Sequence, residues 1–213
     1  MKTILTSLTI LGILGAIGGI FAADNTAVKP AADNRDGLLL EYRFQTNADD
    51  SSGHNLHGKV HGAVSFSTGE AGPCAVFDGR GSFIDSGAPL ADLGPEFTIE
   101  CQVKPARQQV ENANIFGNHV TGGLGMVMQQ DGANANRFAF AYGIGAGGWL
   151  TTKPINLTPE RWQHLAVVKS RHEVRLYLNG ILLETLRTTL ESREQPTTFV
   201  ADKDGVTVNA PTA

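Results

Sequence analysis

One stretch of the chain, residues 154–180, constrains the fold more than any other part of the sequence. It reads PINLTPERWQHLAVVKSRHEVRLYLNG, two alternating segments separated by a charged turn. Alternate residues of an extended chain point to opposite faces, so a period of two predicts two strands that form a hairpin. Leu165 and Val167 fall on one face of the first strand. Trp162 and His164 fall on the other face, and Trp162 is expected to be a core residue.

The end of this stretch predicts a second turn. Asn179 and Gly180 both tolerate positive φ, which suits a tight turn into a strand over residues 181–183. Of the 213 residues, 41% are hydrophobic, 18% are charged and 25 are glycine, and no long helical period appears. This balance favours many short strands joined by glycine turns. The sequence therefore predicts an all-β fold, an antiparallel β-sandwich in a single domain.

Four short motifs follow one another in an order that resembles the laminin-G-like jelly roll of the concanavalin A-like superfamily. They are residues 50–53 (DSSG) with His57-Gly58, residues 75–79 (AVFDG), residues 97–105 (FTIECQVKP), and the Trp-x-His-x-Ala strand with its Leu-Tyr-Leu-Asn-Gly partner. The third motif has Gln102 where the family usually has Trp. The resemblance spans about residues 38–186. It implies a recognition module for glycans or proteins, in a superfamily that also hosts hydrolases.

The first 23 residues are predicted to be a secretory signal peptide. Lys2 precedes an apolar run over residues 4–22, and Ala22 and Ala23 suit cleavage after either of them. The run is also long enough for an uncleaved signal anchor, although its glycines favour cleavage. Residues 24–37 are predicted to be a flexible lead-in, and residues 38–213 the sandwich. We therefore expect a secreted, periplasmic or cell-surface protein, without membrane insertion after cleavage.

The C-terminal end departs from the pattern of the resembling family. The resemblance implies a final strand that completes the sheet, and its motif is missing after Arg187. Residues 199–201 and 206–208 are short apolar runs within a polar tail. Either these runs replace the missing strand, or the sandwich is truncated and has an unpaired edge that is liable to associate.

Cys74 and Cys101 are the two cysteines of the chain, and both are expected on strands. Export would place them where a disulfide can form. The alternative is a pair of buried thiols that act as small hydrophobic residues. Spacing in the sequence does not decide between these alternatives, because it does not give the pairing of the strands.

Charge and motifs argue against two classes of function. The net charge of −4 provides no basic field for nucleic acid. Retaining glycosidases need two carboxyl groups about 5 to 5.5 Å apart, and the Glu-x-Asp-x-x-Glu run of laminarinase-type relatives is absent. Glu96 and Glu100 do not have that spacing, and no Gly-x-Ser-x-Gly motif occurs. We therefore expect a protein that is not an enzyme.

Calcium is the metal that the sequence favours. Calcium prefers oxygen ligands from loop carboxylates, amides and backbone carbonyls, and many members of the resembling superfamily bind it. Asp50 and Asp78 match the loop motifs of that family and are the candidate ligands. Residues 202–205 (DKDG) begin like a calcium loop, but the chain ends before a full loop could follow.

Carbohydrate binding needs an aromatic ring that stacks on a sugar and polar groups that bond its hydroxyls. Trp149 is the candidate ring, because it follows a glycine loop instead of standing in an alternating strand. Tyr142, Asn134 and Asn136 lie in or beside neighbouring loops and are candidate polar partners. The alternative is that Trp149 only caps the edge of the sandwich.

These features favour a secreted, non-catalytic recognition module that binds carbohydrate or protein ligands at the cell surface or matrix. The first alternative is a fragment or accessory domain of a secreted polysaccharide hydrolase. The second is a structural or adhesive sandwich that forms oligomers without binding a sugar.

Overall fold

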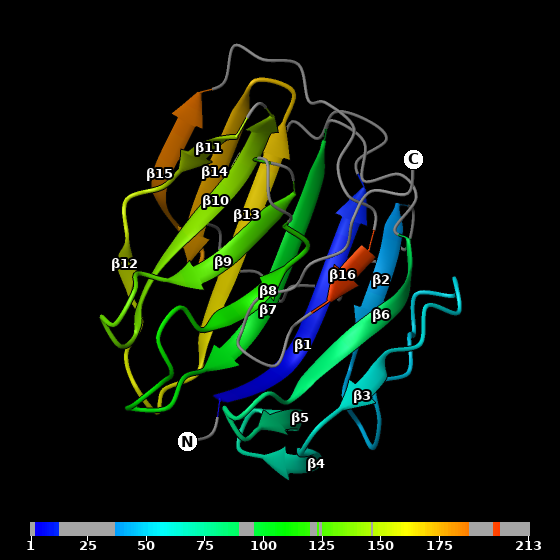
Figure 1. Cartoon of the computed structure of the whole chain (residues 1–213). Coiled ribbons are helices and arrows are strands. Elements are labelled where there is room, and N and C mark those ends of the chain that lie inside the picture. The colour runs from blue at the N-terminus through cyan, green and yellow to red at the C-terminus, as the bar shows by residue number, and fades with distance from the viewer. Residues whose placement is uncertain are drawn as a thin grey trace, which may run out of the picture.

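A computed structural model describes residues 3–12, 37–89, 96–119, 123, 125–145, 147–187 and 198–200. These residues form strands, turns and loops (Figure 1), and none of them belongs to a helix that could cross a membrane. The strands are β1 (Thr3–Gly12), β2 (Leu38–Tyr42), β3 (Lys59–His61), β4 (Val64–Gly69), β5 (Gly72–Phe77), β6 (Phe83–Pro89), β7 (Phe97–Lys104), β8 (Asn114–Gly117), β9 (Met126–Gln130), β10 (Arg137–Gly145), β11 (Gly148–Thr151), β12 (Ile155–Asn156), β13 (Gln163–Ser170), β14 (Glu173–Leu178), β15 (Ile181–Arg187) and β16 (Thr198–Val200).

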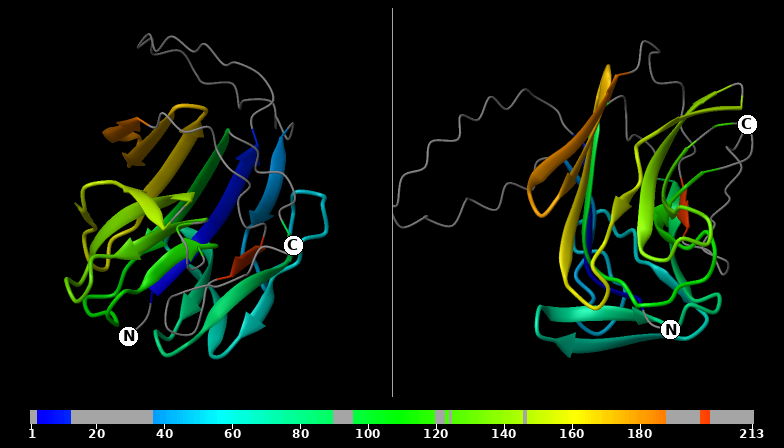
Figure 2. Two further views of the ribbon diagram at one scale, coloured as in Figure 1. Left: turned by 45° about the horizontal axis from the view of Figure 1, so that its top comes forward. Right: turned by 90° about the vertical axis from the view of Figure 1, so that its left-hand side faces the viewer.

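The strands form three antiparallel sheets. The large sheet has the order β15-β14-β13-β7-β1-β5-β4, with β2 paired to β1. The small sheet has the order β11-β10-β9-β8, with β12 on β10, and a third sheet has the order β16-β6-β3. The large and small sheets face each other as two layers, as the right-hand view of Figure 2 shows. The predicted all-β antiparallel jelly-roll sandwich is confirmed.

The core lies between the large and small sheets and follows from alternation along the strands. In β7, Phe97, Ile99, Cys101 and Val103 are buried, and the residues between them are half-buried. β10 alternates in the same way, with Phe138, Phe140 and Tyr142 buried. The two rows meet across the core, since the rings of Phe97 and Tyr142 lie 6.4 Å apart.

The hairpin predicted from residues 154–180 is formed by β13 and β14. Leu165 pairs with Leu178 and Val167 with Leu176, and the turn after β14 has positive φ at both Asn179 (50°) and Gly180 (77°). The expectation that Trp162 is a core residue is wrong. Trp162 precedes β13 and is half-buried, because the inward row of this strand begins at Gln163 and continues through Leu165 and Val167.

The same inward row ends at a buried lysine. Lys169 is 1% exposed, and its ammonium group lies 5.4 Å from the centre of the Tyr142 ring. The ammonium donates hydrogen bonds to the backbone oxygens of Ser170 and Arg171. Burial lowers the pKa of Lys169, and the nearby charge of Glu96 acts in the opposite direction.

Residues 3–12, which belong to the predicted signal peptide, form β1 in the interior of the large sheet (Figure 1). Residues 24–36 of the predicted lead-in lie outside the described residues, and the cleavage of a signal peptide stays a prediction. At the other end, Thr198 and Val200 of β16 pair with β6, so part of the first apolar run of the tail forms a strand. Residues 202–205 and 206–208 lie outside the described part.

Both cysteines are free thiols and both are buried. Their strands explain why they do not meet. Cys74 lies in β5 and Cys101 in β7, and β1 lies between these two strands. Two strand spacings amount to about 10 Å, which is beyond the Cα separation of about 7 Å that a disulfide can span. Burial raises the pKa of the Cys101 thiol to about 12.

Candidate functional site

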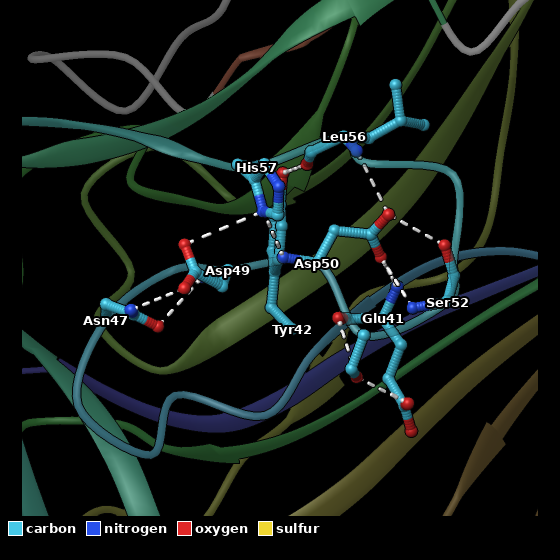
Figure 3. Close-up of polar contacts among 9 residues, drawn as sticks. Glu41, Tyr42, Asn47, Asp49, Asp50, Ser52, Leu56 and His57 are labelled. Atoms are coloured by element: carbon cyan, nitrogen blue, oxygen red, sulfur yellow. Dashed lines mark hydrogen bonds and ion pairs between the residues drawn. The ribbon is translucent and has the colours of Figure 1, made fainter.

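The loop that matches the DSSG motif is organised around Asp50 (Figure 3). Its Oδ1 accepts hydrogen bonds from the backbone amides of Glu41 (3.0 Å) and Ser52 (2.9 Å). Its Oδ2 accepts from the Ser52 hydroxyl (2.7 Å) and the amide of Leu56 (3.0 Å). The carboxylate therefore ties strand β2 to both sides of the loop.

Hydrogen bonds of Tyr42 and His57 also stabilise this loop. The Tyr42 hydroxyl donates to the backbone oxygen of Leu56 at 2.8 Å, and burial raises the pKa of Tyr42. The amide of Asp50 donates to Nδ1 of His57 at 3.2 Å, and the same nitrogen lies 3.6 Å from a carboxylate oxygen of Asp49. The next residue, Gly58, must be small, because a Cβ there would lie 2.5 Å from a methyl carbon of Ile84.

The surroundings of the two predicted calcium ligands determine their charge. Partial burial acts to raise the pKa of Asp50, but the hydrogen bonds from Glu41, Ser52 and Leu56 outweigh it, and the pKa is lower than usual. The pKa of Asp78 is also lowered, mainly by a hydrogen bond from Ser82 and then by one from the amide of Arg80 at 2.8 Å.

Both carboxylates thus stay ionised and serve their own loops. A cation at Asp50 would have to replace hydrogen bonds that the loop already makes. Within the described part of the chain, no three His, Cys, Asp or Glu side chains gather where they could hold a metal ion. Calcium binding stays a prediction.

Trp149 lies in β11 on the outer face of the small sheet, away from the core. It pairs with Gly143 of β10, and Thr151 pairs with Ala141. Paired residues of antiparallel strands lie on the same face. Because Phe140 and Tyr142 point into the core, the residues that alternate with them point outward.

The outer face of the small sheet carries small and amide side chains. The amides lie on β8 and β9, opposite Ala139 of β10, whereas Trp149 lies opposite Gly143, so roughly 15–20 Å separate them from the ring. The residues of this face, placed by register, are Asn114 of β8, Val127 and Gln129 of β9, Ala139, Ala141 and Gly143 of β10, and Trp149 and Thr151 of β11. Small side chains on β10 leave the ring of Trp149, which is half-buried, as the largest group of this face. The oxygen Oδ1 of Asn114 is buried and has no hydrogen-bond partner in the structure.

His119 is the second aromatic residue next to Trp149. The rings lie 6.0 Å apart in an edge-to-face arrangement. The preceding residue, Asn118, is buried and anchors the segment, because its backbone and side chain both bond to the backbone of Met126 at 2.9 Å. Gly125 approaches the same segment so closely that a Cβ there would clash with the backbone of Asn118.

The structure does not gather the other predicted sugar-binding residues around Trp149. Tyr142 is 2% exposed and points into the core, so it does not lie on the outer face. Asn134 and Asn136 belong to the turn between β9 and β10, and Trp149 lies near the opposite end of β10. From Arg137 to Gly143, the strand spans roughly 20 Å at about 3.4 Å per residue.

Asn136 and Asn134 stabilise that turn. Asn136 is buried, has φ of 63°, accepts from Gln109 at 2.8 Å and donates to the backbone oxygen of Arg107 at 3.1 Å. Asn134 is exposed and donates to the backbone oxygen of Asp131 at 3.0 Å. Sequence reasoning missed Asn114, Gln129 and His119. The alternation of aromatic and small residues over 138–142 was a signal in the sequence that one face of this strand carries small residues and points outward.

A family model for the concanavalin A-like lectin/glucanases superfamily matches residues 78–207, more than half of the chain. The protein therefore belongs to this superfamily, as the sequence motifs predicted. A search of the curated protein sequences found no match to the chain.

Two solved proteins illustrate the likeness of the fold. Domain 4 of AbnA, an extracellular arabinanase from Geobacillus stearothermophilus solved with arabinotriose, is 18% identical, with a TM-score of 0.54 over 72% of this chain and 77% of that one. The binding domain of Botulinum neurotoxin DC, solved with SialylT, is 14% identical, with a TM-score of 0.51 over 71% of this chain. This chain covers 40% of the toxin domain.

Proposed function

We propose that the protein is a secreted, non-catalytic recognition module that binds carbohydrate on the outer face of the small sheet. The observation that carries the proposal is the position of Trp149 on a face of small residues, with the ring of His119 6.0 Å away and amide side chains farther along the same face on β8 and β9. Membership of the superfamily supports recognition as the class of function.

The outer face has the two kinds of group that a sugar site needs. The C–H face of a sugar ring packs on an indole ring, and the small side chain of the half-buried Ala141 leaves room for a sugar beside it, whereas Gly143 is buried. Asn114 and Gln129 can donate to and accept from hydroxyl groups. The unpartnered Oδ1 of Asn114 favours a ligand with a hydrogen-bond donor at this position, because an unmade bond of a buried oxygen is unfavourable.

Arabinotriose is the first ligand to test, because the arabinanase domain with the same fold was solved with it. A panel of other oligosaccharides would follow. A protein ligand is the competing possibility, since the same Botulinum neurotoxin DC binding domain was also solved with rat synaptotagmin II. The arabinanase domain likewise supports an accessory domain of a polysaccharide hydrolase as the second candidate function.

The binding test uses the two tryptophans. Trp162→Phe leaves Trp149 as the sole tryptophan, so a change in its fluorescence on titration reports binding at the outer face. In the wild-type background, Trp149→Ala should weaken binding at least tenfold, about 1.4 kcal/mol, through the loss of ring stacking. Tyr177→Ala on β14 of the large sheet is the matched control and should leave the affinity unchanged.

Three outcomes would contradict the proposal in different ways. Equal affinity of the Trp149→Ala variant and the wild type would move the site elsewhere. Absence of binding across the panel would favour a protein ligand or an adhesive role. Release of sugars from polysaccharides would identify an enzyme. Calcium at Asp50 and Asp78 is a separate proposal, and a melting temperature that calcium does not change would count against it.

A further inference from the structure

The N-terminal strand β1 holds the large sheet together. Along one side it pairs with β7 from Ile4 to Gly12. Along the other side its first residues pair with β5 and its later residues with β2. Among the described strands, β1 is the one neighbour of β2 in a sheet. Without β1, the backbone groups of β7 and β2 that face it would lose their partners.

The sequence of β1 suits this position in its register. Leu8 pairs with Cys101 and Tyr42, and Ile10 pairs with Ile99 and Leu40, and these four partners are buried. Thr9, between them, pairs with the half-buried Glu100 and Glu41. Apolar residues of β1 therefore occupy register positions opposite buried residues, and a polar residue occupies the position between them.

The same residues belong to the segment that is predicted to be removed as a signal peptide. Cleavage after Ala22 or Ala23 would separate β1 from the domain and leave the sequences of β7, β2 and β5 intact. We propose that the position between β7 and strands β2 and β5 is a strand-binding site, and that its ligand is the segment Thr3–Gly12, either joined to the domain or as a separate chain.

The physical basis of this site is strand addition at two edges at once. An extended peptide forms main-chain hydrogen bonds with the edge of a sheet, and alternate side chains provide the specificity. Here the peptide has an edge on both sides, β7 on one and β5 with β2 on the other. Buried backbone groups are almost always paired, so a vacant position would favour rebinding of a strand.

The test begins with the full chain, in which a specific protease site is inserted between Ala23 and Asp24. The folded protein is cut and passed through size-exclusion chromatography. We expect the N-terminal fragment to elute with the domain, and the melting temperature to be that of the uncut protein at concentrations where the fragment stays bound. A labelled synthetic peptide, TILTSLTILG with a lysine tail for solubility, should exchange into the cut protein.

Two proline variants of the peptide provide a matched comparison. Leu8→Pro removes the N–H of a residue that pairs with strands on both sides and should lower exchange at least tenfold. Thr6→Pro lies at the register shift between Leu5 and Ser7, belongs to none of the pairs of β1, and should exchange better than Leu8→Pro. Loss of the fragment from the cut protein, with or without unfolding, would overturn the proposal, and so would equal exchange of the two variants.

Discussion

Replacing Asp50 by alanine tests whether one carboxylate holds the first loop to the sheet. The variant removes the acceptor of four hydrogen bonds, three of them from backbone amides. Asp50 is 9% exposed, so water does not readily take its place. The Ser52 hydroxyl can rotate towards other acceptors, whereas the backbone amides of Glu41, Ser52 and Leu56 are fixed in place.

The expected magnitude follows from these three amides. A hydrogen bond to a charged group contributes about 1.5–3 kcal/mol, so the loss of even two of the three bonds should cost at least about 3 kcal/mol of unfolding free energy. For a domain of this size, about 3 kcal/mol corresponds to a fall in melting temperature of roughly 10 °C. Asp50→Asn keeps one carbonyl oxygen and should have about half the effect.

Urea unfolding followed by circular dichroism measures the difference, with Asp49→Ala as the matched control. Asp49 is exposed and its carboxylate bonds the side chain of Asn47 at 2.6 Å, so its removal should cost less than about 0.5 kcal/mol. A cost below about 1 kcal/mol for Asp50→Ala, or equal costs for the two variants, would refute the reasoning.

The effect of Asp50 should also depend on pH. The pKa of this carboxyl is lower in the folded protein than the usual value of about 3.9 in an unfolded chain. A lowered folded pKa stabilises the protein above the unfolded pKa, and that stabilisation is lost as the pH falls through the folded value. The difference between the wild type and Asp50→Ala should therefore be constant near neutral pH and shrink below about pH 4.

Three further predictions concern the core and the small sheet. Gly125→Ala should lower the free energy of unfolding by at least about 3 kcal/mol, because Gly125 has φ of +84° and a Cβ would clash with Asn118. Gly132→Ala is the control and should lower it by about 1 kcal/mol, because Gly132 has φ of +58° but a Cβ there would have nothing within 4 Å. Denaturant unfolding of both variants measures the difference. Cys101 should not react with a thiol reagent at pH 8 until the protein unfolds, since the thiol is buried and its pKa is raised to about 12. Mass spectrometry after timed labelling measures the reaction, and labelling of Cys101 in the folded protein would contradict the prediction. Leu176→Ala should destabilise the sandwich by about 2–5 kcal/mol, because the side chain is fully buried, and a loss below about 1 kcal/mol would place it outside the core.

Local alternation was enough to predict the strands of the hairpin and which residues share a face. Leu165 and Val167 share a face as their period of two predicted, and the structure shows that this face, with Leu176 of the partner strand, is the buried one. The error at Trp162 came from taking a large aromatic residue as evidence of burial, although alternation along the strand places it on the face that does not carry Leu165. Alternation was the better guide, because pairing in a sheet fixes the face of every residue on the strand.

The candidate site was less accessible to sequence reasoning, because it depends on the pairing of four strands. Trp149 was found from its glycine-rich surroundings. Asn134 and Asn136 are close to it in sequence but lie at the other end of β10, whereas His119, farther away in sequence, packs against its ring. Register between strands separated by long loops is not contained in any local pattern. A list of residues near Trp149 in sequence therefore could not give its neighbours in space.

The position of β1 has a consequence for the order of synthesis. The segment Thr3–Gly12 leaves the ribosome before its partner strand β7, which follows roughly 90 residues later, about 5–20 s at the usual rate of translation. During that interval the apolar segment has no β7 to pair with, and export machinery could bind it if it is the signal peptide that the sequence predicts. Whether the segment directs transport or completes the sheet would then be decided by timing, so a slower passage through residues 13–104 would favour transport.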